Sequence, residues 1–192
     1  MVMSAITALR RRFHDKPYAL TLVALGCLFS APILAQEHHA AGLLSDEELI
    51  KSAESAAPMA IAKEATIIAL TAEGKIRTVR KGTNNFTCMP DNPTTPGPDP
   101  MCMDQNALEW ATAWMEHKEP PKGKVGFMYM LAGGTDASNT DPYAQKQTGP
   151  HVMVVGAKGI MEGYPRAAKP GTSKPYVMWP DTPYEHLMIP IR

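Results

Sequence analysis

A proline-rich segment enclosed by two cysteines is the feature that most restricts how this chain can fold. Thirteen residues separate Cys88 from Cys102, and five of them are prolines, at positions 90, 93, 96, 98 and 100. Because proline fixes its own φ angle, this segment is stiff whether or not the two sulfurs are joined. The cysteines can form a disulfide, a metal site, or a reactive thiol with its partner. Three flanking methionines could add soft ligands to a metal site: Met89, Met101 and Met103.

The N-terminus carries the signature of an export signal. Four basic residues precede an uncharged, mostly apolar stretch at residues 19–34, and Ala35 supplies a small residue for cleavage before Gln36. The apolar stretch has about 16 residues, fewer than the roughly 20 that a membrane-spanning helix needs. We therefore expect residues 1–35 to be a signal peptide and the protein to be periplasmic or secreted. An uncleaved anchor, a lipidated Cys27 and the twin-arginine export route are the alternatives.

Export would place both cysteines in an oxidising compartment, where disulfides form and persist. The spacing of Cys88 and Cys102 is far from the C-x-x-C pattern of redox and zinc sites. A closed loop of about 15 residues stabilises a fold by roughly 3 kcal/mol in the chain-entropy model. The prolines reduce that gain because they stiffen the open loop as well. We therefore predict a disulfide, with a metal pair and a catalytic thiol as alternatives.

The charge and length of the mature chain limit its partners and its architecture. Residues 1–35 contain four of the 19 basic residues and one of the 19 acidic residues, which leaves a net charge of −3. A weakly acidic chain without a basic run is not expected to bind nucleic acid or a membrane surface. The expected partner is a small ligand or a metal ion, and the oligomeric state is left open. We expect a mobile lead-in at residues 36–44 and a single domain at residues 45–192.

Local patterns predict an α+β fold. Ser45 and Glu48 form a capping box for a helix that runs to about residue 57, and Asp104 can cap a second helix that ends near residue 118. Strands are expected at residues 65–70, 75–80, 124–131, 151–155, 176–179 and 186–191. We expect a mainly antiparallel sheet with the two principal helices packed on one side of it.

Two of the expected strands begin with the same pattern, a histidine followed two residues later by a methionine. His151 and Met153 point to the same side of their strand because side chains alternate, and so do His186 and Met188. If these strands are neighbours in a suitable register, two imidazoles and two thioethers meet on one face, and this ligand set suits copper(I). Copper or zinc is therefore a candidate cofactor. The alternative is that the methionines fill the core and each histidine bonds to a loop.

A long polar loop between two strands, at residues 133–147, suggests a different chemistry. Asp141 precedes His151 by ten residues, so Asp141 can orient the imidazole and His151 can act as a general base. Ser138 is then the candidate nucleophile, although no G-x-S-x-G motif surrounds it. The alternative is that residues 139–142 build an Asx turn or a β-turn.

The second expected helix carries two tryptophans, Trp110 and Trp114, four residues apart. This spacing places both indoles on neighbouring positions of one helix face. We expect them to pack in the core between the helix and the sheet, and a stacking platform for a ligand is the alternative.

Five motifs occur in a characteristic order along the chain: GTNNFTCMPD, DPMCMD, SNTDPYA, GPHVM and TPYEHLMIPI. Together they resemble elements of a family of exported bacterial hypothetical proteins, and the resemblance spans most of residues 45–192. The resemblance implies export and a single domain. It implies no activity, ligand or cofactor.

These observations support three hypotheses about function. The first is a periplasmic protein that binds a metal or a small ligand through the face that carries His151 and His186. The second is a small periplasmic hydrolase that uses Asp141 and His151. The third is an accessory or structural domain without a ligand. The sequence alone leaves open whether the protein is an enzyme.

Overall fold

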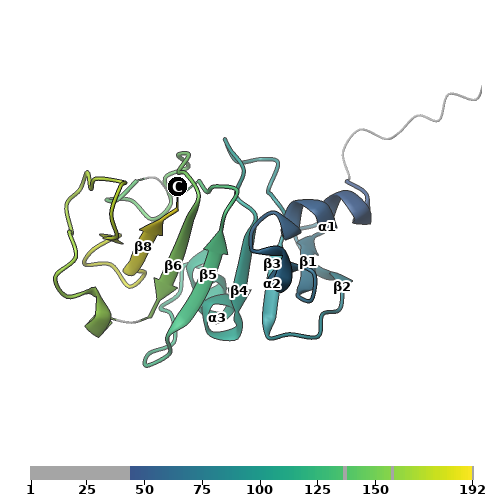
Figure 1. The fold of residues 1–192 in the computed structure, drawn as a ribbon, viewed down its shortest axis with the longest axis horizontal. Helices are drawn as coiled ribbons and strands as arrows, with labels where there is room; N and C mark the ends of the chain where they lie inside the picture. Colours follow the sequence, from purple (N-terminus) through teal and green to yellow (C-terminus); the bar gives the residue numbers. More distant parts are fainter. Residues whose placement is uncertain (1–43, 136–137, 157, 192) are drawn as a thin grey trace, which may run out of the picture. The chain divides into compact units, whose positions relative to one another are not determined.

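The computed structural model describes residues 44–135, 138–156 and 158–191. The predicted signal peptide at residues 1–35 lies outside these ranges, as does most of the predicted lead-in. The described residues form an α+β fold around one eight-stranded sheet (Figure 1). No helix among them is long and apolar enough to cross a membrane.

The sheet is mixed but mostly antiparallel, as expected. Its strands lie in the spatial order β2-β1-β3-β4-β5-β6-β8-β7, and among the described strands only β1 and β3 pair in parallel. The strands are β1 (Thr66–Leu70), β2 (Ile76–Arg80), β3 (Phe86–Met89), β4 (Met101–Asp104), β5 (Gly126–Met130), β6 (His151–Val155), β7 (Tyr176–Met178) and β8 (His186–Pro190). The cysteine-flanked segment therefore contributes two strands, β3 and β4, joined by the proline-rich loop.

The helical elements are α1 (Asp46–Glu54), α2 (Met59–Ala62), α3 (Gln105–Met115) and the 3-10 turn η1 (Lys158–Met161). The predicted capping box begins α1, because the Glu48 N–H donates to Ser45 Oγ at 3.2 Å and the Ser45 N–H donates to Glu48 Oε2 at 2.8 Å. The first helix ends earlier than expected, and Pro58 caps the separate short helix α2. Proline disfavours the helical conformation in the residue before it, which keeps α1 and α2 apart.

Asp104 ties the start of α3 to the sheet. One carboxylate oxygen accepts the Ala107 N–H at 2.8 Å and caps the helix as predicted, while the other accepts the Phe127 N–H at 3.0 Å. Gly126 allows this close approach, because a Cβ at that position would lie 2.3 Å from the backbone nitrogen of Ala107. The result is that α3 lies directly against β4 and β5.

The two principal helices cover opposite faces of the sheet, which corrects the expectation of helices on one side. Cys102 packs with Ala53 of α1, whereas the next residue, Met103, packs with Ala107 of α3. Successive side chains of a strand point to opposite faces, so α1 and α3 cannot share a face. Local patterns predict each helix but do not show which face it covers.

Methionines dominate the face that α3 covers. Four of them occupy directly opposite positions on β4, β5, β6 and β8, and we call this set the methionine row: Met103, Met128, Met153 and Met188. Side chains in such positions lie about 5 Å apart at their Cβ atoms. The methionine row therefore forms a continuous thioether surface across the middle of the sheet.

Candidate functional site

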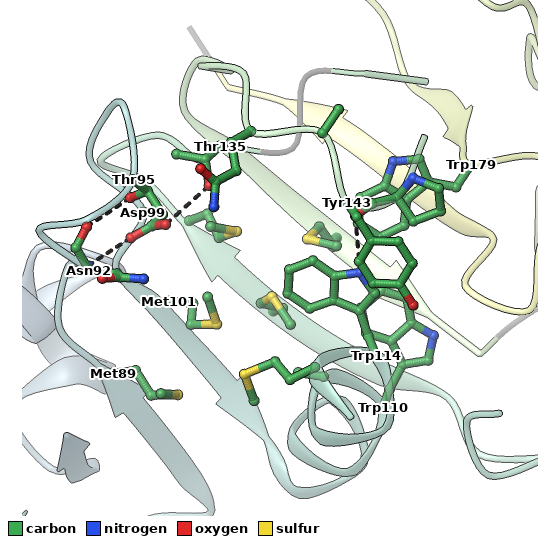
Figure 2. A pocket seen from close by; sticks show the side chains of 18 of the residues that line it. Met89, Asn92, Thr95, Asp99, Met101, Trp110, Trp114, Thr135, Tyr143 and Trp179 are labelled. Atoms are coloured by element: carbon green, nitrogen blue, oxygen red, sulfur yellow. Dashed lines mark hydrogen bonds between the residues drawn. The ribbon is translucent and has the colours of Figure 1, made fainter. Parts of the chain in front are cut away.

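A cavity of about 320 Å³ lies on the face of the sheet that α3 covers, between the sheet, α3 and the loop that follows β5 (Figure 2). Its floor consists of five strand methionines: Met89, Met101, Met128, Met130 and Met153. Two pairs of them occupy directly opposite positions on neighbouring strands, Met89 with Met101 and Met128 with Met153. Methionine side chains are flexible and polarisable, so such a floor adapts its shape to an apolar molecule.

Aromatic rings form one wall of this cavity. All three tryptophans of the chain line it, two from α3 and one from the turn after β7: Trp110, Trp114 and Trp179. Trp179 stacks on Trp114 with ring centroids 5.7 Å apart and on Trp110 with centroids 6.3 Å apart. Tyr143 also stacks on Trp114, with ring centroids 6.3 Å apart and an interplanar angle of 2°. The tryptophans thus line the cavity and also form part of the core.

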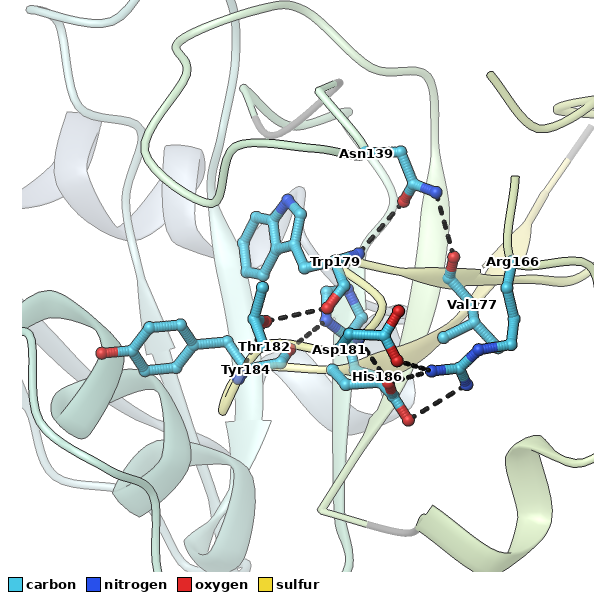
Figure 3. A network of polar contacts seen from close by, with 9 residues as sticks. Asn139, Arg166, Val177, Trp179, Asp181, Thr182, Tyr184 and His186 are labelled. Atoms are coloured by element: carbon cyan, nitrogen blue, oxygen red, sulfur yellow. Dashed lines mark hydrogen bonds and ion pairs between the residues drawn. The ribbon is translucent and has the colours of Figure 1, made fainter. Parts of the chain in front are cut away.

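The buried side chain of Asn139 holds this aromatic wall in place (Figure 3). Its Oδ1 accepts the Trp179 N–H at 3.1 Å, and its Nδ2 donates to the Val177 carbonyl at 3.2 Å. The indole N–H of Trp179 donates to the Ser138 carbonyl at 2.8 Å, and that of Trp114 donates to the Pro142 carbonyl at 3.1 Å. The polar loop therefore acts as a clamp on the tryptophans.

An ion-pair cluster supports the turn that carries Trp179. Arg166 contacts the buried carboxylate of Glu185 with both terminal nitrogens and bonds to Asp181 at 3.1 Å (Figure 3). The Asp181 N–H also donates to Glu185 at 2.8 Å. Burial tends to raise the pKa of Glu185, but the hydrogen bonds from Arg166 and Asp181 outweigh it and lower the pKa. The carboxylate is therefore charged at neutral pH and fixes the turn.

Asp99 marks the polar end of the cavity. Its side chain is 8% exposed, and its two oxygens accept the Asn92 N–H at 2.9 Å and the Thr135 hydroxyl at 3.1 Å. Burial raises the pKa of this carboxyl, because the charged form is poorly solvated. In Figure 2 the polar residues Asn92, Asp99 and Thr135 lie on one side of the methionine floor, and the aromatic wall lies on the other. The cavity is therefore amphiphilic along its length.

The predicted metal ligands share one face, but the two histidines do not meet. In the antiparallel pairing of β6 and β8, Met153 lies opposite Met188, whereas Val155 lies opposite His186. His151 and His186 are consequently four positions apart along the strands, which is roughly 13 Å. The register that we expected to join two imidazoles joins only the two thioethers.

Each of these histidines bonds to a backbone carbonyl two residues before it. His186 Nδ1 lies 2.9 Å from the Tyr184 oxygen, and His151 Nδ1 lies 2.8 Å from the Gly149 oxygen. A carbonyl only accepts, so both Nδ1 atoms carry a proton. Burial lowers the pKa of His186 to about 4, and its ring contacts Trp179 edge-on at 4.9 Å. Among the described residues, no group of three or more His, Cys, Asp or Glu side chains could hold a metal ion.

The predicted catalytic residues have backbone partners instead of one another. Asp141 is exposed, and its Oδ1 accepts the Tyr143 N–H at 2.9 Å, which closes an Asx turn. The Nδ1 of His151, the atom that an orienting carboxylate would hold, bonds to the Gly149 carbonyl. Ser138 contributes its carbonyl to Trp179. The loop geometry thus matches the alternative interpretation, in which Asp141 builds an Asx turn instead of orienting His151.

The predicted disulfide is confirmed, with Cys88 and Cys102 joined by an S–S bond of 2.05 Å. Both cysteines are fully buried on the face covered by α1 and α2, so the bond lies on the side of the sheet away from the cavity. The loop that the bond closes supplies Asn92, Thr95 and Asp99 to the polar end. A covalent link therefore fixes both ends of a cavity-lining loop.

Sequence reasoning missed the residues that define the two ends of this cavity. Asp99 lies in the proline-rich loop, where no periodic pattern marks a site, and Trp179 follows a strand of only three residues. The floor had a usable signal, because methionines alternate with other residues in MCM at 101–103 and in MYM at 128–130. No family model, curated protein or solved structure matches the chain, so the functional inference rests on the site itself.

Proposed function

We propose that this is an exported binding protein that holds a small apolar, preferably aromatic, molecule in the cavity between the methionine floor and the tryptophan wall. The observation that carries the proposal is the convergence of five strand methionines and all three tryptophans on one cavity. Export is supported by the predicted signal peptide and by the disulfide, which is typical of proteins outside the cytosol.

The physical basis is burial of apolar surface. A volume of about 320 Å³ lies at the lower end of the range for small-molecule sites, so a ligand of one or two fused rings is the appropriate size. Each Å² of apolar surface removed from water contributes roughly 25 cal/mol, and indole rings add stacking contacts. Methionine lets the floor fit ligands of somewhat different shape.

Binding is preferred over hydrolysis because the hydrolase hypothesis depended on a contact between Asp141 and His151. The Asp141 carboxylate closes a turn, and the His151 Nδ1 bonds to a backbone carbonyl. Neither group is oriented by the other for acid–base work. The structure also gives the polar loop a different task, since it holds the indoles of Trp114 and Trp179.

A second candidate ligand is a soft monovalent metal ion, copper(I). Met128 and Met153 occupy directly opposite positions and both line the cavity, so their thioethers can converge on one ion. Thioethers select copper(I), whereas zinc sites use thiolate, imidazole and carboxylate ligands. This candidate shares Met153 with the ligand set that the sequence suggested, but it pairs Met153 with Met128 of β5 and uses neither histidine.

The three tryptophans make the test of the main proposal direct. Residues 36–192, purified with the disulfide intact, are titrated with the neutral probe 1-naphthylmethanol while tryptophan emission is recorded. We expect saturable one-to-one quenching. The variant Ala144→Phe places a ring at a lining position and should abolish the signal, whereas Ala60→Phe changes an exposed alanine of α2 and should not. Absence of saturable binding by the unmodified chain would contradict the proposal.

A further inference from the structure

The cavity contains a carboxyl group without a basic counterpart. Asp99 is the one acidic residue among the described lining residues, and none of them is lysine or arginine. His117 and Tyr143, the other ionisable lining groups, belong to the aromatic end. An ion that enters the polar end therefore meets one acidic group and no fixed positive charge.

The immediate surroundings of Asp99 do not neutralise it. Its hydrogen-bond donors are neutral, namely the Asn92 N–H and the hydroxyls of Thr135 and Thr95, and no described basic side chain forms an ion pair with it. A second carboxylate is close by, since Asp91 Oδ1 accepts the Asp99 N–H at 2.8 Å. Burial of an uncompensated carboxylate is costly, and a cation that binds beside it recovers part of that cost.

We propose that the ligand of this cavity is an aromatic or apolar amine whose protonated amino group binds Asp99. This inference rests on the proposed binding function and names its ligand class. The ammonium group would form a charge-assisted hydrogen bond with the carboxylate, while the apolar body lies on the methionine floor. The separation of Asp99 from the tryptophan wall in Figure 2 requires the amine at one end of an elongated molecule and the ring at the other.

Two probes of nearly equal shape separate charge from apolar fit. 1-Naphthylmethylamine is a cation at neutral pH, and 1-naphthylmethanol is neutral. Both are titrated into residues 36–192 with the disulfide intact, and tryptophan emission reports binding. We expect the amine to bind at least tenfold more tightly than the alcohol. In Asp99→Asn this preference should vanish while the alcohol keeps its affinity. In Asp141→Asn, which removes an exposed carboxyl from outside the lining, the preference should remain.

Each outcome has a distinct meaning. If neither probe binds, the proposed function itself fails. If both bind equally, the cavity binds apolar molecules and the inference about amines is overturned. If the preference survives in Asp99→Asn, the cation is held elsewhere, and the role of Asp99 is overturned. Binding of the alcohol also shows whether Asp99→Asn is folded.

The unmodified chain provides a second test that needs no folded Asp99 variant. As the pH falls, Asp99 takes up a proton and loses its charge, while the amine stays protonated, so the preference for the amine should decline. Asp91, whose Oδ1 accepts the Asp99 N–H, and His117, which lines the cavity, are the neighbouring titratable groups, and Asp91→Asn and His117→Asn serve to subtract their effects. If the preference for the amine over the alcohol does not change with pH in the unmodified chain and in these two variants, the inference is overturned.

Discussion

Cys88 and Cys102 lie directly opposite each other on β3 and β4, and their neighbours Met89 and Met101 form the next opposed pair on the other face of the sheet. The disulfide thus lies beneath the floor of the cavity. It also fixes both ends of the loop that carries Asp99. This relationship links the oxidation state of the two cysteines to the geometry of the cavity.

Removal of the disulfide should weaken both the fold and the site. For Cys88→Ala/Cys102→Ala we expect the free energy of unfolding to fall by up to about 3 kcal/mol, because the unfolded chain regains the freedom of a loop of this size. We also expect weaker binding of 1-naphthylmethylamine, because Asp99 is less well held. Urea denaturation and the probe titration measure the two effects. A reductant should destabilise the unmodified chain but leave the double variant unchanged, and equal urea midpoints for the two chains would contradict the prediction.

Asn139 should be among the most sensitive polar residues. Asn139→Ala removes the acceptor for the Trp179 N–H and the donor for the carbonyls of Val177 and Ala167. Because the buried Trp179 N–H and Val177 carbonyl then lose this partner, we expect a loss of about 2–4 kcal/mol in the free energy of unfolding and a change in tryptophan emission. Asn85→Ala, at an exposed asparagine, is the matched control and should lose less than about 0.5 kcal/mol. Equal stability of the two variants would show that the hydrogen bonds of Asn139 do not stabilise the fold.

Local features of the fold were readable from the sequence because they depend on neighbouring residues. The capping box of Ser45 and Glu48, the cap by Asp104 and the alternation along β2 and β5 all depend on contacts within a few residues. The disulfide was predictable for a different reason, since chain chemistry and the expected compartment restrict what two cysteines can do. These predictions needed no knowledge of how the strands are ordered.

The site depends on strand order and register, which one sequence does not reveal. The expected contact of His151 with His186 needed a register in which the two strand starts coincide, but an antiparallel pair places its starts at opposite ends. The Asp99 carboxylate is positioned by a hydrogen bond from Thr135, which lies 36 residues later in the chain. The methionines were visible as a pattern, yet only the order β4-β5-β6-β8 makes them a row.

The buried His186 should make the protein sensitive to mild acid. Burial lowers its pKa from 6.5 to about 4 in the folded state, so between these values the unfolded chain binds a proton that the folded chain does not. Stability contributed by this residue is complete above about pH 6.5 and is lost as the pH falls toward 4, with a total of about 3 kcal/mol. Denaturation by urea at a series of pH values measures this slope.

The variant His186→Asn separates this effect from general acid unfolding. The amide can still donate to the Tyr184 carbonyl, but it does not titrate, so the slope between pH 6.5 and 4 should decrease even though the lost ring lowers stability at every pH. His117→Asn changes an exposed histidine and should keep the slope. The prediction is wrong if His186→Asn has the same slope as the unmodified chain.

The candidate copper(I) site gives a prediction that rests on sulfur alone. Met128→Leu/Met153→Leu removes two opposed thioethers from the floor but nearly preserves side-chain volume, so each change should cost less than about 1.5 kcal/mol in stability.

Silver(I) replaces copper(I) as the probe, because it needs no reductant that would open the disulfide. If the thioethers bind the ion, the unmodified chain should bind one silver ion and quench its tryptophans, and the double variant should bind it at least tenfold more weakly. Met59→Leu, at a methionine that is 60% exposed, and Met161→Leu, in the cluster on the opposite face, should bind silver like the unmodified chain. Equal silver affinity in all four chains would leave the methionines as a floor for apolar ligands and remove the metal from consideration.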